Sequence, residues 1–404
     1  MKAVILAAGR GTRMRPLTDD TPKPLLPVAG KPIIQHTVDL LEEYVEQFII
    51  VTGYRADEIE AYFSGRDDCV FVHQEEPLGT ADAALKAKEY VEGKTVIANG
   101  DDIYKFSPEK TKEFETGIFV SEVEDPEKYG VIETEGEKIK NIVEKPSNPS
   151  SNLVNTGLYV VNEKFFEILG KVEESERGEL EITDAVSEYI KQEDLKAFKA
   201  EKWLPCSHPW NLLEANRDLL DDLKRSIDGK VSDSATVKGS VHVEEGAEIR
   251  ENCVIEGPAV IQSNTVVGPN THIRPGTVLG EGVKTKFSEV KNSILLRDST
   301  LSHFNYVGDS IIGEDVNFGA GAKSLNLLNS GENVKVEIKG ELVETGRRKL
   351  GCVIGSGAKI GAGTVIKPGR KIGLNASTDA NEKIKYNLPE NALFKEGEII
   401  ENWN

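Results

Sequence analysis

The sequence predicts a two-domain chain: an α/β domain with a mostly parallel sheet, followed by a parallel β-helix of hexapeptide repeats. Up to about residue 226, strand-like apolar runs alternate with helix-like amphipathic runs, a pattern typical of a sheet covered on both faces by helices. After a hinge at residues 228–230, aliphatic residues recur at every sixth position, which fits neither a helix nor an ordinary strand. We therefore expect the domains to span residues 1–226 and 227–404.

The first domain is expected to contain six strands and six helices. The predicted strands cover residues 3–6, 47–52, 70–72, 95–99, 118–123 and 158–161. The predicted helices cover residues 33–43, 56–63, 81–90, 163–169, 182–191 and 212–226. Ligands of such sheets bind at the carboxyl ends of the strands, so we expect a binding site at the loops after residues 6 and 99.

The period of six is the strongest pattern in the sequence. Nine positions in succession, from Val231 to Leu279, are aliphatic, as expected if each short face of a coil points one side chain inward. The rhythm falters at Thr285, resumes at Leu295 and returns from Ile354 to Ile372. The charged stretch 327–350 is too long for a coil face and is predicted to be an inserted loop, a common location for function.

Composition and charge exclude several classes of function. The 68 acidic and 49 basic residues give a net charge of −19, which argues against binding nucleic acid or an anionic membrane. The four cysteines form no CxxC pair, which indicates a reducing cytoplasmic location and no zinc site. No apolar run is long enough to span a membrane, and a first strand at residue 3 leaves no room for a signal peptide.

The turn after the first strand is predicted to hold phosphate groups. Ala7, Ala8, Gly9 and Gly11 have little side-chain bulk, so successive backbone N–H groups can approach an anion closely. Arginine and lysine side chains in the same region add positive charge. Neither common phosphate fingerprint is present, because no third glycine and no Gly-Lys-Ser/Thr sequence follows.

Residues 6–14 and 22–24, Leu-Ala-Ala-Gly-x-Gly-Thr-Arg-Met and Pro-Lys-Pro, resemble the signature of the sugar-phosphate nucleotidylyltransferases. The resemblance implies a Rossmann-like fold in which a nucleoside triphosphate, UTP or dTTP, is bound by its phosphates. It implies nucleotide-binding roles for Leu6, Ala7, Ala8, Gly9, Gly11 and Thr12, and catalytic roles for Arg13 and Lys23.

Further fragments match this family in order. The segment with Gln74, Gly79 and Thr80 resembles the one that reads the nucleobase, where a glutamine amide can hydrogen-bond a pyrimidine. Asp101 follows a strand and matches the family's Mg²⁺ ligand, although a capped turn would give the same Gly-Asp sequence. The resemblance assigns the sugar phosphate to the segments that contain Gly130, Glu144 and Asn155.

One departure affects the metal site. The family usually carries Trp-x-Asp-x-Gly near the end of this domain, and its aspartate is a second Mg²⁺ ligand. Here Pro205 stands at that position, and a proline side chain cannot bind a metal ion. Either Asp101 and the phosphates hold the ion alone, or a neighbour such as Asp102 contributes.

The β-helix contains a candidate general base. A neutral imidazole near pH 7 can accept a proton from an amine that attacks a thioester, so His303 is a candidate, although a lone histidine is more often structural. The stretch around it, His-x-x-Tyr-x-Gly-Asp, resembles the left-handed β-helix acetyltransferase domain of the GlmU-like bifunctional enzymes, in particular their archaeal type.

That resemblance implies further site residues and a trimer. It assigns the sugar phosphate of the second site to Arg274, Lys291, Tyr306 and Asn317, and acetyl-CoA to Ala320, Asn326 and Ser356. Acetyl-CoA is expected to bind between neighbouring coils. Ala322 and Leu327 depart from the family's usual residues and bear on acceptor preference.

The sequence therefore predicts a bifunctional enzyme. Acetyl would pass from acetyl-CoA to glucosamine-1-phosphate, and the product would react with UTP to give UDP-N-acetylglucosamine and pyrophosphate. Two alternatives stay open: a monofunctional glucose-1-phosphate thymidylyl- or uridylyltransferase whose coil only assembles subunits, and a non-catalytic nucleotide-sugar-binding regulatory subunit. Neither the sugar epimer nor the pyrimidine follows from the sequence.

Overall fold

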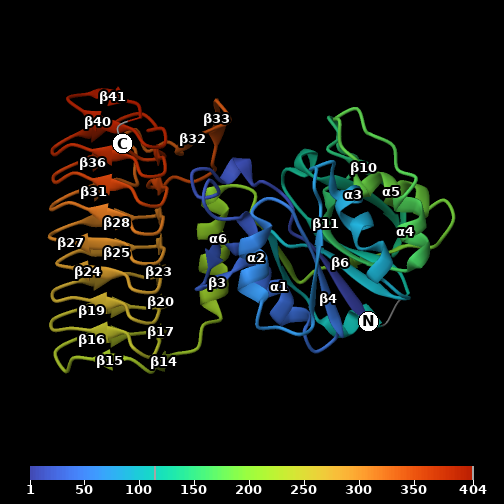
Figure 1. Cartoon of the computed structure of the whole chain (residues 1–404), viewed down its shortest axis with the longest axis horizontal. Helices are drawn as coiled ribbons and strands as arrows, with labels where there is room; N and C mark the ends of the chain where they lie inside the picture. Colours follow the sequence, from blue (N-terminus) through green and yellow to red (C-terminus); the bar gives the residue numbers. More distant parts are fainter. Residues whose placement is uncertain (113–114, 403–404) are drawn as a thin grey trace. The chain divides into compact units, whose positions relative to one another are not determined.

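The computed structural model describes residues 1–112 and 115–402, which form two compact units. The first unit contains residues 1–10, 22–25 and 32–205, and the second contains 11–21, 26–31 and 206–404. Figure 1 shows an α/β unit in blue to green and a coiled β unit in yellow to red. Two short N-terminal segments and the last helix, α6 (Pro209–Asp221), therefore group with the coil, in contrast to a single cut at residue 226.

The first unit is built on a nine-stranded sheet in the order β5-β4-β1-β6-β11-β8-β12-β10-β9. Strand β1 lies between β4 and β6 and pairs in parallel with both. The expected parallel arrangement holds for the first four strands, whereas β11 is antiparallel to β6 and β8. The strands β9 and β10 form a hairpin through Gly136, and so short a connection requires antiparallel pairing.

All six predicted strands are present. The strands of this unit are β1 (Lys2–Leu6), β4 (Gln47–Thr52), β5 (Cys69–His73), β6 (Thr95–Asn99), β8 (Gly117–Glu122), β9 (Gly130–Glu135), β10 (Lys138–Glu144), β11 (Leu153–Val161), β12 (Lys196–Lys199), and a separate pair, β7 (Asp102–Lys105) and β13 (Lys202–Pro205). The strand predicted at residues 158–161 begins five residues earlier than expected, at Leu153.

Helices cover both faces of this sheet, as predicted. They are α1 (Ile33–Leu41), α2 (Ala56–Phe63), α3 (Thr80–Lys86), α4 (Glu163–Leu169) and α5 (Ile182–Tyr189). Alternate residues of β1 belong to different cores: Val4 packs in the core with α3, α4 and α5, and Ile5 in the core with α1 and α2. Because neighbouring side chains of a strand point to opposite faces, an all-apolar strand such as β1 must be buried on both.

The second unit is a left-handed parallel β-helix with three faces, as the period of six predicts (Figure 1). Face 1 consists of β14 (Ser226–Ile227), β17 (Val241–Val243), β20 (Ala259–Ile261), β23 (Thr277–Leu279), β26 (Ile294–Leu295), β29 (Ile311–Ile312), β34 (Val353–Ile354) and β37 (Lys371–Ile372). Face 2 consists of β15 (Lys230–Val231), β18 (Glu248–Ile249), β21 (Val266–Val267), β24 (Lys284–Lys286), β27 (Thr300–Ser302), β30 (Asn317–Phe318), β35 (Lys359–Ile360), β38 (Ser377–Thr378), β40 (Leu393–Lys395) and β41 (Glu398–Ile400). Face 3 consists of β16 (Thr236–Lys238), β19 (Val254–Glu256), β22 (His272–Ile273), β25 (Glu289–Lys291), β28 (Tyr306–Gly308), β31 (Lys323–Ser324), β36 (Val365–Ile366) and β39 (Lys383–Ile384).

The predicted aliphatic positions form the core of the coil. Those from Val243 to Leu279 are at most 1% exposed, and Val231 and Val237 pack against the same core at its first turn. Thr285, where the rhythm falters, still points inward and is fully buried. The next inward residue, Val290, follows after five positions, so shortened corners account for the shift in phase.

The predicted insertion is a β-hairpin. Strands β32 (Lys335–Ile338) and β33 (Glu341–Glu344) pair antiparallel between the coil strands β31 and β34. At the base of this insertion Leu327 pairs with Lys349, and Leu350 N–H donates to the Asn326 carbonyl at 2.9 Å. The segment that follows the hairpin, residues 346–350, is thereby fixed to the coil.

Helix α6 (Pro209–Asp221) packs on the coil. It begins three residues before the predicted start because His208 and Asn211 form a capping box and Pro209 occupies the first turn. Leu220 joins Val260 and Val278 in a small apolar core. Within the part of the chain that the structure describes, no helix is long and apolar enough to cross a membrane.

Candidate functional sites

The turn after β1 is shaped by close backbone contacts. Ala7 N–H donates to the Val51 carbonyl at 2.8 Å, and Gly100 N–H donates to the Leu6 carbonyl at 2.8 Å. A Cβ on Gly53 would lie 2.8 Å from the Ala8 oxygen, so glycine is required there for the loops to approach each other. Gly9 and Arg10 are exposed, which leaves the predicted phosphate turn accessible.

The continuation of this turn lies in the second unit. Gly11 has a φ of 59° and precedes a short 3₁₀ helix, Thr12–Met14. Its carbonyl accepts hydrogen bonds from Met14 N–H and from the Thr18 hydroxyl, each at 2.8 Å. Arg13 is exposed on this fixed turn, where its guanidinium is available to a phosphate.

The two predicted residues Lys23 and Asp101 are in direct contact. The Lys23 ammonium lies 2.6 Å from the Asp101 carboxylate, although the residues are far apart in sequence. Lys23 is only 7% exposed, whereas the Asp101 side chain is 39% exposed. A buried cation next to an accessible carboxylate at the end of β6 is an arrangement suited to a phosphate and its metal ion.

The structure places Pro205 opposite Asp102, in the antiparallel pair of β13 and β7. Asp102 is 7% exposed and accepts hydrogen bonds from the Trp203 indole at 3.3 Å and the Asn99 amide at 3.5 Å. The Asp102 carboxylate thus links β7 to Trp203 of β13 and to Asn99 of β6. Among the residues described, no group of three or more His, Cys, Asp or Glu side chains could hold a metal ion.

These residues fit Mg²⁺ only as a site with few protein ligands. Mg²⁺ commonly binds one or two carboxylates and takes its other ligands from phosphates and water. Asp101 supplies one accessible carboxylate, and the phosphates of a bound nucleotide would supply further oxygens. The site therefore suits an ion that arrives with its nucleotide rather than a resident one.

The predicted nucleobase segment is fixed from two sides. The Gln74 amide donates to the Gly79 carbonyl at 3.1 Å and to the Asp82 carboxylate at 2.8 Å. Both amide hydrogens are thus used, so the Gln74 carbonyl oxygen is oriented as an acceptor, which matches the N3–H of uracil or thymine. A Cβ on Gly79 would lie 2.4 Å from the Leu180 oxygen, so only glycine fits there.

The predicted sugar-phosphate residues of the first unit converge. A Cβ on Gly130 would lie 3.1 Å from the Glu144 carboxylate and 3.6 Å from the Asn155 Cβ. Arg177 bridges Glu144 and Glu181 at 3.5 Å and 3.1 Å. Burial and the Glu144 charge raise the pKa of Glu181, so the Glu181 carboxyl keeps its proton more readily than an ordinary glutamate does.

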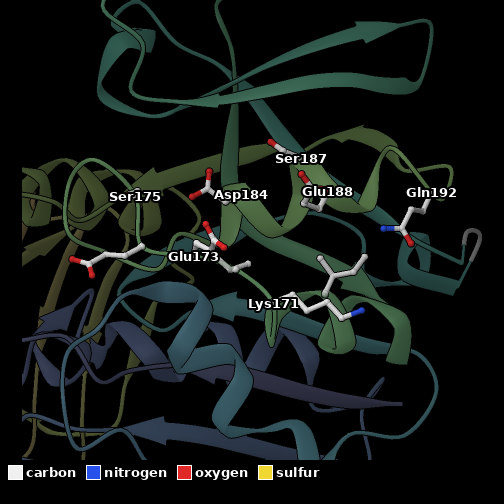
Figure 2. A pocket seen from close by; sticks show the side chains of 10 residues that line it. Lys171, Glu173, Ser175, Asp184, Ser187, Glu188 and Gln192 are labelled. Carbon is white, nitrogen blue, oxygen red and sulfur yellow. The ribbon is translucent and has the colours of Figure 1, made fainter.

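A cavity of about 500 Å³ lies beside this cluster, between the start of α5 and the segment that follows α4. Figure 2 shows Glu173, Asp184 and Glu188 around it, with Lys171 at its edge. Burial, together with the charge of Glu144, raises the pKa of Asp184. The excess of carboxylates makes the cavity unsuitable for a phosphate.

Three of the predicted coil residues, Arg274, Lys291 and Tyr306, occupy adjacent turns of face 3. Glu289 pairs with Tyr306, and the Arg274 N–H donates to the Val290 carbonyl one turn away at 2.8 Å. The Arg274 guanidinium lies 2.9 Å from the Glu289 carboxylate. Burial and the charges of Asp309 and Glu289 raise the pKa of Tyr306, which therefore keeps its hydroxyl proton. This face therefore presents two cations and a hydroxyl donor, a combination that suits a phosphate group.

Asp309 organises the edge of this face. Its carboxylate is 4% exposed and accepts hydrogen bonds from the amides of Asn292 at 2.6 Å and Asn326 at 2.5 Å. The Lys291 ammonium lies 3.5 Å from the same carboxylate. Three donors around one buried carboxylate fix Lys291 and Asn326 in orientation. The predictions omitted this role, although Asp309 closes the matched motif.

His303 lies at the corner between face 2 and face 3. Its φ is 76°, its backbone N–H donates to the Lys286 carbonyl at 3.1 Å, and its carbonyl accepts from Gly321 N–H at 2.7 Å. The imidazole is exposed, and no hydrogen bond of its ring nitrogens exists in the described part of the chain. Two exposed aromatic rings adjoin it: Phe304, which is 72% exposed, and Phe287, with 5.7 Å between ring centroids.

The remaining predicted residues lie on several parts of the coil. Ala320 shares the corner of His303, and Asn317 is on face 2 just before that corner. Asn326 follows face 3. Ser356 lies at the corner between faces 1 and 2, where its hydroxyl accepts from Glu314 N–H at 3.1 Å. Within one chain, Ser356 and His303 thus occupy different corners.

Sequence reasoning missed the residues that hold others in place. Asp82 fixes the Gln74 amide, Arg177 bridges the sugar-site carboxylates, and Asp309 holds Lys291. Each is charged; Asp82 and Asp309 adjoin or belong to a matched motif, whereas Arg177 lies outside the motifs described above. Only the tertiary structure reveals their partners, which come from other strands or turns.

Comparisons with known proteins agree with this architecture. A family model described as nucleotidyl transferase matches residues 2–222, and one described as GMPPB C-terminal domain matches residues 249–345. The chain is 42% identical over 404 residues to "Bifunctional protein GlmU" of Methanocaldococcus jannaschii, with 99% of each chain covered. It is 38% identical to the "Bifunctional sugar-1-phosphate nucleotidylyltransferase/acetyltransferase" of Sulfurisphaera tokodaii, covering 98% of this chain and all of that one.

Among solved structures, a putative glucose-1-phosphate thymidylyltransferase from Bacillus anthracis matches with a TM-score of 0.51 and 30% identity. It covers 56% of this chain and 97% of its own. The two bifunctional relatives thus match this chain over nearly its whole length, through both units. The chain belongs to the nucleotidyl transferase family and, over its full length, groups with the GlmU-named bifunctional proteins.

Proposed function

We propose that the chain makes UDP-N-acetylglucosamine in two steps, in the cytoplasm: acetylation of glucosamine-1-phosphate by acetyl-CoA, then transfer of a uridylyl group from UTP. The observation that carries the proposal is that Arg274, Lys291 and Tyr306 lie on successive turns of face 3, whose edge toward face 2 bears the exposed His303. A coil that served only as a scaffold would need no such set. The four free cysteines are consistent with a reducing compartment.

In the acetyl transfer, the amine nitrogen of the sugar attacks the thioester carbonyl carbon and CoA leaves as its thiol. His303 takes the proton from the attacking nitrogen and returns it to the departing sulfur. Arg274 and Lys291 bind the sugar phosphate, and Asp309 keeps Lys291 oriented. Asn317 and Tyr306 contact the sugar, and Ala320, Asn326 and Ser356 contact acetyl-CoA.

In the uridylyl transfer, a phosphate oxygen of the sugar phosphate attacks the α-phosphorus of UTP in line, and pyrophosphate leaves. Lys23 and Arg13 bind the phosphates and offset their negative charge, so catalysis comes mainly from positioning and electrostatics. Mg²⁺ held at Asp101 would neutralise charge on the triphosphate when bound. Gln74, Gly79 and Thr80 hold the pyrimidine, and Gly130, Glu144 and Asn155 hold the sugar phosphate.

The exposed aromatic rings next to His303 support a homotrimer in which a second copy covers this corner. A contiguous apolar pair on a coil is unfavourable in water and is typical of an interface. A bound acetyl-CoA would then lie between copies, which would bring Ser356 of one chain to the site of another. The molecular mass in solution, measured by light scattering with and without acetyl-CoA, tests this arrangement.

His303→Ala tests the acetyltransferase function. A general base contributes roughly a hundredfold to ten-thousandfold, so acetyl transfer should fall by at least the lower figure, while pyrophosphate release is unchanged. His242→Ala, which alters a histidine on face 1, is the matched control. Acetyl transfer at the wild-type rate in His303→Ala would contradict the proposal.

A panel of sugar-1-phosphates with UTP or dTTP tests the substrates of the first domain, with pyrophosphate as the readout. The Gln74 acceptor suits both pyrimidines, so the two nucleotides should both react. N-acetylglucosamine-1-phosphate should give the highest kcat/KM. A clear preference for glucose-1-phosphate together with absent acetyl transfer would favour the monofunctional thymidylyl- or uridylyltransferase instead.

A further inference from the structure

A second cavity lies in the coil unit, at the corner between face 3 and face 1, and its volume is about 600 Å³. Its floor is formed by four successive turns of the coil, at Pro258, Pro275, Asn292 and Asp309. One wall is helix α6, and the other is the segment 347–349, which follows the inserted hairpin. His303 lies at the opposite edge of face 3, so this cavity is separate from the acetyl-transfer corner.

The cavity is strongly cationic in a chain whose net charge is −19. Five cationic side chains line it, against the carboxylates of Asp221 and Asp309; they are Arg217, Lys291, Arg347, Arg348 and Lys349. A cluster of positive charges in an otherwise acidic protein attracts anions and raises their concentration near the cavity. The composition of this lining points to an anion as the ligand.

Three of these cations form no ion pair with any residue that the structure describes. Lys291 is 3.5 Å from Asp309, and Arg347 is 3.1 Å from Glu214 of α6. Across residues 1–112 and 115–402, by contrast, Arg217, Arg348 and Lys349 form no ion pair, and all three are exposed. Their charge is therefore free for a ligand.

The walls of the cavity are held in place before any ligand binds. The Asn216 side chain is fully buried and donates to the Gly276 carbonyl at 2.9 Å, which fixes α6 to the floor one residue before Arg217. The ion pair of Arg347 with Glu214 holds the other wall against the same helix. A pre-organised site loses little conformational entropy on binding.

We propose that this cavity binds a phosphate-bearing anion, with Arg217 and Arg348 as its principal ligands and Lys291 shared with the acceptor site of the coil. Guanidinium groups match the geometry of phosphate oxygens and can donate two parallel hydrogen bonds. Several cations around one cavity favour a ligand with two or more negative charges, such as a phosphate monoester or pyrophosphate. The proposal rests on the proposed function only in the shared use of Lys291.

Calorimetric titration of the full chain in Mg²⁺-free buffer tests this site with three probes: inorganic phosphate, inorganic pyrophosphate and glucosamine-1-phosphate. The pyrophosphate titration uses a Lys23→Ala background, so that binding at the first unit does not contribute. Arg217→Ala/Arg348→Ala should weaken binding at least tenfold, and wild-type affinity should fall as salt rises. Lys230→Ala/Lys238→Ala, which removes two exposed charges at the first turn of the coil, is the matched control and should leave affinity unchanged.

The outcomes separate the two sources of phosphate. Tightest binding of glucosamine-1-phosphate, with a raised KM for that acceptor and an unchanged kcat in the double variant, identifies the sugar phosphate. Tightest binding of pyrophosphate, with acetyl-transfer KM unchanged in the double variant, identifies a diphosphate. Equal affinity in wild type and double variant, or no saturable binding of any probe, overturns the proposal. Arg217→Gln/Arg348→Gln provides the same test if the alanine variant is unstable.

Failure of the site and failure of the proposed function are distinguishable. His303→Ala should lose acetyl transfer and keep its anion affinity, because His303 lies on the opposite edge of face 3. Anion binding in a protein without acetyl transfer would leave this site standing and remove the function. Acetyl transfer in a protein that binds none of the three probes at this cavity would leave the proposed function standing and overturn this site.

Discussion

The two units build anion sites in different ways. In the α/β unit, Lys23 and Asp101 meet across 78 sequence positions, and the surrounding turns depend on glycines such as Gly79, where no Cβ fits. In the coil, Arg274, Lys291 and Tyr306 lie on successive turns of face 3, and parallel backbone pairing fixes their positions relative to one another. A site of the first kind depends on how distant loops pack, whereas a site of the second kind is fixed by the repeat itself. Substitutions should therefore act differently in the two units.

The largest expected effect is on the loop-built site. Asp101→Ala removes the accessible carboxylate beside Lys23, so pyrophosphate release should fall at least about a hundredfold while acetyl transfer stays at the wild-type rate. Asp67→Ala, an exposed aspartate of the same unit, is the control. Parallel assays of both activities on one preparation provide the measurement; loss of both would indicate misfolding rather than a metal or phosphate role.

On the coil, Asp309→Asn should impair the acceptor site. The amide no longer attracts Lys291, and it cannot accept from both Asn292 and Asn326 as the carboxylate does. Hydrogen bonds to a charged group contribute about 1.5–3 kcal/mol, so the KM for glucosamine-1-phosphate should rise roughly tenfold to a hundredfold.

The matched control for Asp309→Asn is Asp315→Asn. Both aspartates have a left-handed backbone, with φ of 50° and 51°, but Asp315 is exposed. Equal kinetic effects of the two changes would show that Asp309 acts on the stability of the coil and not on Lys291.

A third prediction concerns how the coil holds elements from outside the repeats. The Asn216 side chain accepts from Ala29 N–H and donates to the Gly276 carbonyl, both at 2.9 Å, and it is fully buried. Asn216→Ala leaves the half-buried Ala29 N–H and the buried Gly276 carbonyl without these partners, so the free energy of unfolding should fall by about 2–4 kcal/mol. Denaturant unfolding measures the loss, with the exposed Asn329→Ala as the control; an equal effect of both would contradict the bridge.

The smallest expected effect concerns Lys371 on face 1. Burial lowers the pKa of Lys371 from its ordinary value of 10.5, so the unfolded chain binds this proton more tightly than the folded chain. The free energy of unfolding should therefore rise with pH through the window just below 10.5. Lys371→Met should flatten this slope and add about 0.5 kcal/mol at pH 8. Thermal melts across pH, with the exposed Lys359→Met as the control, measure it.

The sequence by itself determined the two architectures. The period of six predicted nine residues of the coil core from Val231 to Leu279, because a repeat assigns each position to a face without knowledge of distant contacts. The apolar run of β1 likewise predicted a buried strand followed by a turn of small residues, and the structure pairs this strand with β4 and β6. Both patterns are local, so they can be read from neighbouring residues.

Only the tertiary structure decided which distant segments contact one another. It joined α6 to the coil, fixed the Gln74 amide through Asp82, and gathered Arg217, Arg347 and Arg348 around one cavity. Helix α6 was predicted from its amphipathic pattern. That pattern indicates that one apolar face is covered, but it does not identify the element that covers it. Charged side chains carry still less information, because a solvated arginine and a ligand-binding arginine have the same sequence neighbours, and only the positions of other charges tell them apart.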